Sequence, residues 1–169
     1  MFDEAIDIYK SLDWKNEDLV ASRYMFCLSQ KEEFQRAKEI YLEIPDESKS
    51  EKVVGVYLHV LEKSHDNDYI SCLEKTIQEN CDSIEALFAA SFYINDKQAF
   101  KRYVLPVLGR KMVNLSWDNI PFYIKAGLLL KFSQFGLFKQ MEQVLVEIQD
   151  LHMLDQHIVN EIYKSFPEL

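Results

Sequence analysis

Two stretches of the sequence, FDEAIDIYKSL at Phe2–Leu12 and FQRAKEIYLEI at Phe34–Ile44, decide the fold. Each has an aromatic residue, an alanine three residues later, an Ile-Tyr pair and a closing aliphatic residue. On an α-helix this spacing places the aromatic, the alanine, the tyrosine and the aliphatic residue on one face. The small alanine lets a neighbouring helix approach closely. We therefore predict two copies of one amphipathic helix.

Weaker copies of this stripe begin at Tyr69, Phe100 and Phe138. The five starting aromatics are separated by 32, 35, 31 and 38 residues, which average 34. The segments between them have helical apolar stripes of their own and are joined by short polar turns. Only 4 of the 169 residues are glycine and 4 are proline, which also favours helices over a turn-rich β fold. The sequence predicts an all-α protein, an α-solenoid of antiparallel helical hairpins with about ten helices and a repeat near 34 residues.

The predicted organisation is a single helical-repeat domain over residues 1–169. Pro106 lies inside a second helix, and we expect that helix to kink or stop near Val104, because proline lacks a backbone donor and clashes with the preceding turn. The chain opens on a second helix, which leaves an unusual cap, a longer array or a partner covering that end as alternatives. The predicted elements are a lone helix at 2–12, hairpins at 18–45, 51–80, 83–108 and 119–151, and a final helix at 155–166.

A hairpin of this length, with an aromatic–x–x–small stripe on its second helix, resembles the tetratricopeptide repeat. The resemblance covers almost the whole chain, but the repeats are degenerate, and the turn glycine of the family is present only as Gly136. A related helical-hairpin solenoid is the main alternative. The best-matching unit has Tyr24 and Met25 at the family's Leu-Gly pair, Leu28 at its first Tyr, and Phe34, Ala37, Tyr41 and Ile44 at the second-helix signature.

In that family the first helix of each repeat lines a concave groove. The resemblance implies that the groove is aromatic and aliphatic here, with Phe88 and Phe92 as a central ridge, and a large exposed apolar face normally marks a contact site. Two alternatives stay open: the chain's own terminal helix fills the groove, or the register is off by one residue. The predicted partner-binding residues are Phe26, Tyr57, Leu61, Phe88, Phe92, Tyr123 and Leu130.

Charge is unevenly distributed along the chain. The net charge is −9, which disfavours a general nucleic-acid binder. Residues 1–85 have 20 acidic and 10 basic side chains, whereas the stretch 97–141 has eight basic and one acidic. The second stretch is either a site for an acidic peptide or another anionic ligand, or a set of solvated helix faces. The residues of this predicted basic patch are Lys97, Lys101, Arg102, Arg110 and Lys111.

The sequence contains none of the catalytic or metal-binding motifs that we looked for. There is no phosphate-binding loop, no HExxH and no GxSxG, the four histidines are scattered, and none of the three cysteines forms a CxxC. We predict no enzyme activity, no catalytic residue, no metal and no cofactor. The start MFDEAIDIYK lacks the apolar core of a signal peptide, and lysines interrupt the most apolar stretch, Ile120–Phe138, so we predict a cytoplasmic protein that does not span a membrane.

The leading hypothesis is a protein–protein interaction scaffold that holds a helix or peptide of another protein in an apolar concave groove. One alternative is a regulatory or sensory module that binds a short signalling peptide or an anionic ligand through the basic stretch 97–141. A further alternative is a subunit of a larger assembly. Neither nucleic acid nor membrane is an expected partner.

Overall fold

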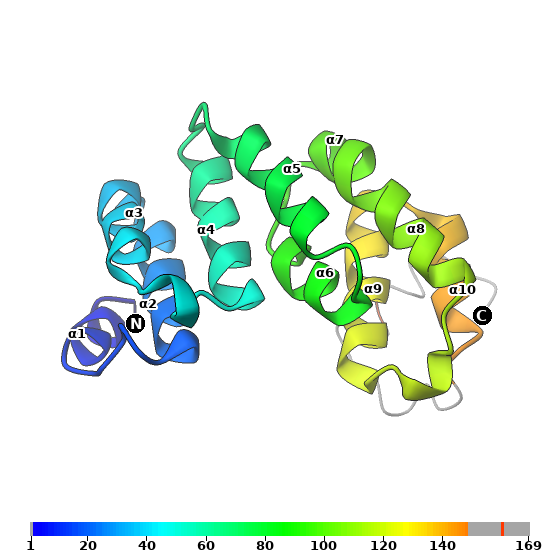
Figure 1. Ribbon diagram of the computed structural model, residues 1–169, viewed down its shortest axis with the longest axis horizontal. Coiled ribbons are helices and arrows are strands. Elements are labelled where there is room, and N and C mark those ends of the chain that lie inside the picture. The colour runs from blue at the N-terminus through cyan, green and yellow to red at the C-terminus, as the bar shows by residue number, and fades with distance from the viewer. Residues whose placement is uncertain (1, 149–159, 161–169) are drawn as a thin grey trace. The chain divides into compact units, whose positions relative to one another are not determined.

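The computed structural model describes residues 2–148 and residue 160 of the chain (Figure 1). Its regular elements are all helices, which confirms the predicted all-α class for the described residues. The final helix predicted at 155–166 lies outside them, apart from Asn160. The helices are α1 (Phe2–Lys10), α2 (Asp18–Gln30), α3 (Phe34–Glu43), α4 (Glu51–Lys63), α5 (Tyr69–Glu79), α6 (Ile84–Ser91), α7 (Lys97–Ala99), α8 (Leu105–Val113), α9 (Phe122–Phe135) and α10 (Phe138–Leu145).

The chain divides into two compact units, Met1–Leu108 and Gly109–Leu169. In the first unit, α2 packs against α1, α3 and α4, and α4 packs in turn against α3, α5 and α6. The core between these helices contains fully buried residues from both stripe-bearing and intervening helices, among them Ala21, Met25, Ala37, Val53 and Val60. The apolar side chains that recur at helical spacing in the sequence therefore pack together and form one core between successive helices.

Gly55 permits a close contact between α4 and α6 in the first unit. A Cβ atom at Gly55 would lie 2.6 Å from the carbonyl oxygen of Ala89 and 3.0 Å from that of Ala90. These neighbours are backbone atoms, so they cannot move aside as the end of a flexible side chain would. The two helices thus meet backbone to backbone at this point, which requires a residue without a side chain.

The two turns that join α2 to α3 and α4 to α5 share one backbone geometry. Glu32 has a φ of 60° and His65 a φ of 51°, the left-handed region that is unusual for residues other than glycine. In each turn the N–H of the next residue donates to a carbonyl five residues back, that of Leu28 at 3.0 Å and that of Leu61 at 2.9 Å. This hydrogen bond satisfies a carbonyl at the helix end, as in a Schellman motif.

Of the two outcomes expected near Val104, a kink or a stop, the stop does not occur, and the helical path is instead irregular up to that residue. Helices α7 and α8 are joined by a π-helical segment, Phe100–Val104, that ends two residues before the proline. A π-helical turn is wider than an α-helical turn, and it accommodates both the missing N–H of Pro106 and the bulk of its ring. The chain continues as α8 beyond it.

The described part of the second unit contains the packed pair α9 and α10. Its buried side chains include Ile124, Leu128 and Phe132 from α9, and Met141 and Val144 from α10. None of the helices in residues 2–148 combines the length and the apolar composition needed to cross a bilayer.

Gly136 closes the turn between α9 and α10 in the left-handed conformation, with φ 64° and ψ 39°. Leu137 donates its N–H to the carbonyl of Phe132 at 2.8 Å, and Gly136 donates to that of Ser133 at 3.0 Å. We expect Gly136→Ala to lower the free energy of unfolding by about 1 kcal/mol, because a Cβ is strained in this conformation. Urea denaturation measures the change. Gly136→Asn should retain most of the stability, since asparagine tolerates this conformation, and equal stability of the alanine variant would contradict the assigned turn.

Candidate functional site

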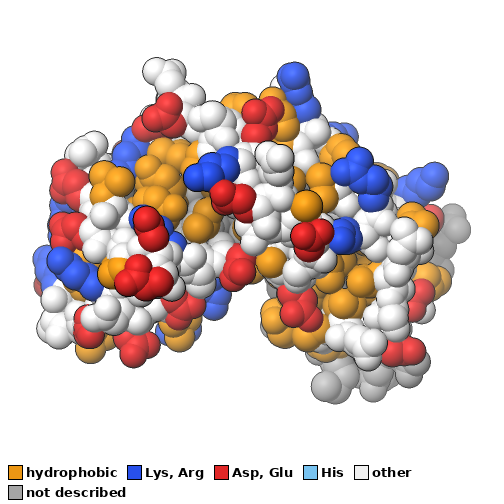
Figure 2. Space-filling model, in the orientation of Figure 1, with side chains coloured by type: hydrophobic (Ala, Val, Ile, Leu, Met, Phe, Trp, Pro, Cys, Tyr) orange, Lys and Arg blue, Asp and Glu red, His pale blue; other side chains and the backbone are white. Residues whose placement is uncertain are grey.

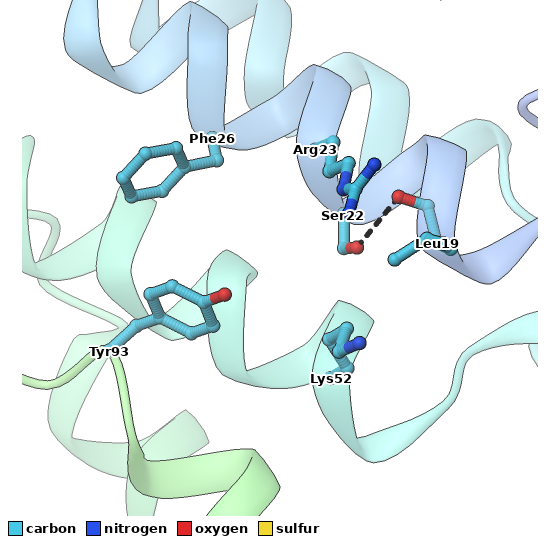
Figure 3. Close-up of a pocket in the computed structure, with 6 residues that line it drawn as sticks. All are labelled: Leu19, Ser22, Arg23, Phe26, Lys52 and Tyr93. Carbon is cyan, nitrogen blue, oxygen red and sulfur yellow. Dashed lines mark hydrogen bonds between the residues drawn. The ribbon is translucent and has the colours of Figure 1, made fainter. Parts of the chain in front are cut away.

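A cavity of about 170 Å³ opens beside α2 in the first unit (Figure 3). Its lining residues on α2 are three or four positions apart, so they occupy one face of that helix. Figure 3 shows the rings of Phe26 and Tyr93 at one end of the cavity and Lys52 of α4 across from α2. The lining residues are Leu19, Ser22, Arg23 and Phe26 from α2, Lys52 from α4, and Tyr93, which follows α6.

An aromatic row extends from that end of the cavity, where Phe26 and Tyr93 line it. The ring centroids of Phe26 and Tyr93 are 5.7 Å apart, and Phe26 also stacks on the His59 ring at 5.7 Å. Phe92 meets Tyr93 edge to face at 5.3 Å, and Phe88 lies 5.1 Å from Phe92. Tilted and edge-to-face contacts at these distances are favourable between aromatic rings. We call these five residues the aromatic row.

Hydrogen bonds to α4 hold the backbone beside Tyr93 in place. His59 Nδ1 lies 3.1 Å from the carbonyl oxygen of Tyr93, and the Asn95 side-chain amide donates to the same oxygen at 3.0 Å. The Asn95 backbone N–H donates to the Glu62 carboxylate at 2.8 Å. His59 is only 4% exposed, so it is an interior histidine. The wall is therefore built by α2, α4 and the segment after α6 together.

Two cations and no acid line the cavity. Arg23 and Lys52 are both exposed, and neither makes an ion pair with a described residue. Burial raises the pKa of the Tyr93 hydroxyl, and the positive charge of Arg23 acts in the opposite direction. Tyr93 is consequently protonated at neutral pH and has a hydrogen to donate. The site can accept an apolar group beside the rings and negative charge beside the two cations.

Of the predicted groove residues, only Phe26 lines the cavity, whereas Phe92 and the buried Phe88 belong to the aromatic row without lining it. The other two predicted residues of the first unit lie elsewhere. Tyr57 stacks on Tyr41 of α3, with ring centroids 3.7 Å apart and planes at 3°, where Figure 2 shows hydrophobic surface over α3 and α4. Leu61 is 2% exposed and belongs to the core.

The difference on α4 has a physical cause. On α4, Lys52 lines the cavity and His59 stacks on Phe26; the two residues are seven positions apart and share a face. Tyr57 lies on another face, and Lys49 covers its stacking partner Tyr41 with the ammonium 4.7 Å from the ring centroid. The groove positions that the family resemblance assigned to α4 therefore lie on a different face of this helix from the residue that lines the cavity.

The remaining predicted site residues lie apart from the cavity lining. In the second unit, Tyr123 of α9 is 66% exposed and Leu130 is half-buried. Of the basic patch, Lys111 is half-buried and the other four residues are exposed, with Arg102 placed 5.3 Å from the ring of Tyr103. Lys131, a further cation of the basic stretch, is 4% exposed and so does not contribute to an exposed basic surface.

Residues 2–148 and 160 contain no cluster of three or more histidine, cysteine or acidic side chains able to hold a metal ion. The three cysteines are unpaired by disulfides. Burial raises the pKa of the Cys27 and Cys72 thiols, which disfavours the reactive thiolate at neutral pH.

Sequence reasoning missed three of the residues that line the cavity: Arg23, Lys52 and Tyr93. The signal for the two cations was available, because Arg23 is three residues before the predicted groove residue Phe26 on the same helix face, and Lys52 precedes the apolar stripe of α4. Tyr93 gave no such signal, since α6 ends at Ser91 and helical spacing does not extend to it. We found no match to this chain among models of protein families, curated proteins or solved structures.

Proposed function

We propose that the chain is a degenerate tetratricopeptide-like solenoid. The shared turn geometry supports this proposal, because the carbonyls that accept the closing hydrogen bonds, those of Leu28 and Leu61, are 33 residues apart. The same bond ends α9 at Phe132 in the second unit. The packing of α2 on α4 and of α4 on α6 also supports it, since these are the first helices of successive hairpins.

We propose that the protein is a non-enzymatic interaction scaffold, and that the cavity beside α2 binds an apolar side chain of a partner peptide or helix. The observation that supports this function best is an open cavity lined at one end by Phe26 and Tyr93 of the aromatic row. Its volume of about 170 Å³ is comparable to the roughly 150 Å³ that holds a benzene ring in an engineered protein cavity. One aromatic or large aliphatic side chain therefore fits.

Burial of one such side chain contributes about 1.5–3 kcal/mol, relative to leaving it exposed. Buried aromatic contacts at the centre of an interface often dominate its binding energy. The Phe26 ring is the best-placed protein group for this role, because it faces the cavity and is supported from behind by His59.

We expect Phe26→Ala to weaken binding of a partner peptide at least about tenfold, which corresponds to roughly 1.4 kcal/mol. The peptide is first selected against the wild-type protein from a random displayed library, and its affinity for each variant is then measured by calorimetry. Phe34→Ala is the matched control, because Phe34 is also half-buried against the same core but does not line the cavity. Both variants should lose similar stability, and only Phe26→Ala should lose affinity. Equal affinity of the two variants for the peptide would refute the cavity as the binding site.

A further inference from the structure

Given the proposed function, we infer that the partner segment in the cavity is acidic: an aromatic side chain enters between Phe26, Tyr93 and Leu19, and carboxylates next to it in the peptide pair with Arg23 and Lys52. The inference concerns the chemical class of the partner, whereas the proposed function requires only an apolar anchor.

Within residues 1–85, Arg23 and Lys52 differ from most basic side chains in making no ion pair with a described residue. Residues 1–85 contain ten basic side chains, and seven of them pair with a carboxylate of the described residues. The three others are Arg23, Lys52 and Lys63, of which the first two line the cavity. The seven pairs are Lys10–Asp7, Lys15–Glu43, Lys31–Asp3, Arg36–Glu33, Lys38–Asp66, Lys49–Asp46 and Lys75–Glu79.

The positions of the two cations match a ligand with negative charge close to its anchor. Arg23 is on α2 and Lys52 on α4, so they border the cavity from two helices. Residues 1–85 are acidic overall, and they repel an acidic segment at long range. Charges beyond about 10 Å are largely screened at 0.1 M salt. The attraction is therefore local, and the carboxylates must lie within a few residues of the aromatic anchor.

Other charges on the ligand fit the site less well. A basic segment would place its cations against Arg23 and Lys52, with no acid in the cavity lining to compensate. A nucleic-acid strand is held by many phosphate contacts, and two cations supply few of them. The protonated hydroxyl of Tyr93 offers a further donor to a carboxylate.

Three synthetic peptides of equal length test the inference by fluorescence anisotropy. The first has one phenylalanine between two Glu-Glu pairs, the second has glutamine in place of every glutamate, and the third has alanine in place of the phenylalanine. We expect the first peptide to bind at least about tenfold more tightly than either of the others, and to weaken as sodium chloride is raised. Equal binding of the glutamate and glutamine peptides would overturn the acidic class and leave the proposed function intact. Failure of both phenylalanine peptides to bind would count against the proposed function as well.

Charge variants then locate the contact on the protein. Lys52→Gln and Arg23→Gln should each weaken binding of the glutamate peptide about threefold, the size expected for exposed ion pairs, and should weaken binding of the glutamine peptide less. Lys63→Gln is the matched control, because Lys63 is also exposed on α4 and does not line the cavity. A loss of affinity with Lys63→Gln equal to that with Lys52→Gln would show a diffuse charge effect and overturn the assignment.

Discussion

Gly55→Ala is expected to lower the free energy of unfolding by about 3 kcal/mol, the upper end of the usual cost of overpacking. The added Cβ would lie 2.6 Å from the carbonyl oxygen of Ala89, so α4 and α6 would have to separate. Separation also withdraws apolar side chains of both helices from contact and leaves voids in a close-packed core. Urea denaturation followed by circular dichroism measures the loss.

Gly109→Ala provides the control for this substitution. Gly109 lies in the interior of α8, and a Cβ there would meet nothing within 4 Å. The alanine should raise the free energy of unfolding by roughly 0.5–1 kcal/mol, since glycine has a lower helix propensity. Opposite effects of one added methyl group at the two glycines would identify close helix approach as the cause. A Gly55→Ala variant as stable as the wild type would show that α4 and α6 do not meet as described.

Ala37→Leu is expected to cost about 2 kcal/mol of unfolding free energy by overpacking. Ala37 is the small residue of the aromatic–x–x–small stripe on α3, and its exposed fraction is 0%. The matched control is Ala5→Leu on α1, the same position in the first copy of the stripe, where the alanine is only half-buried. Its larger side chain has room to reach solvent, so the cost should be less than half. Thermal unfolding of both variants tests the difference, and an equal cost would mean that Ala37 is not a tightly packed contact.

The helices could be predicted because the residues that fix them are local. The stripe in FQRAKEIYLEI requires only helical spacing to place Phe34, Ala37 and Tyr41 on one side, and the core of the first unit uses that side. The course of the chain through Pro106 could not be predicted in the same way. A proline removes one α-helical hydrogen bond, but the sequence does not show that a π-helical turn will form before it and allow the helix to continue.

The candidate site was only half predictable, for a related reason. Phe26, Phe88 and Phe92 could be named because each lies in or at the end of a helix whose stripe is readable. His59 meets Phe26 and Tyr57 meets Tyr41 because α4 packs against several helices at once, and the sequence pattern of α4 alone does not specify that packing. The position of Tyr93 depends on hydrogen bonds to residues more than thirty positions earlier, which no local pattern encodes.

The parallel stack of Tyr41 on Tyr57 gives the protein a built-in optical reporter. The two phenol rings are 3.7 Å apart with nearly parallel planes, so their electronic transitions couple. The near-ultraviolet circular dichroism should therefore contain a contribution that vanishes when α3 separates from α4. The same stack should be visible in an alkaline titration, because burial, with the neighbouring Cys72 and Tyr57 in second place, raises the pKa of Tyr41 to about 12. The phenolate absorbance of Tyr41 would develop at a higher pH than that of an exposed tyrosine. The separation of α3 from α4 can therefore be followed spectroscopically without attaching a label to the protein.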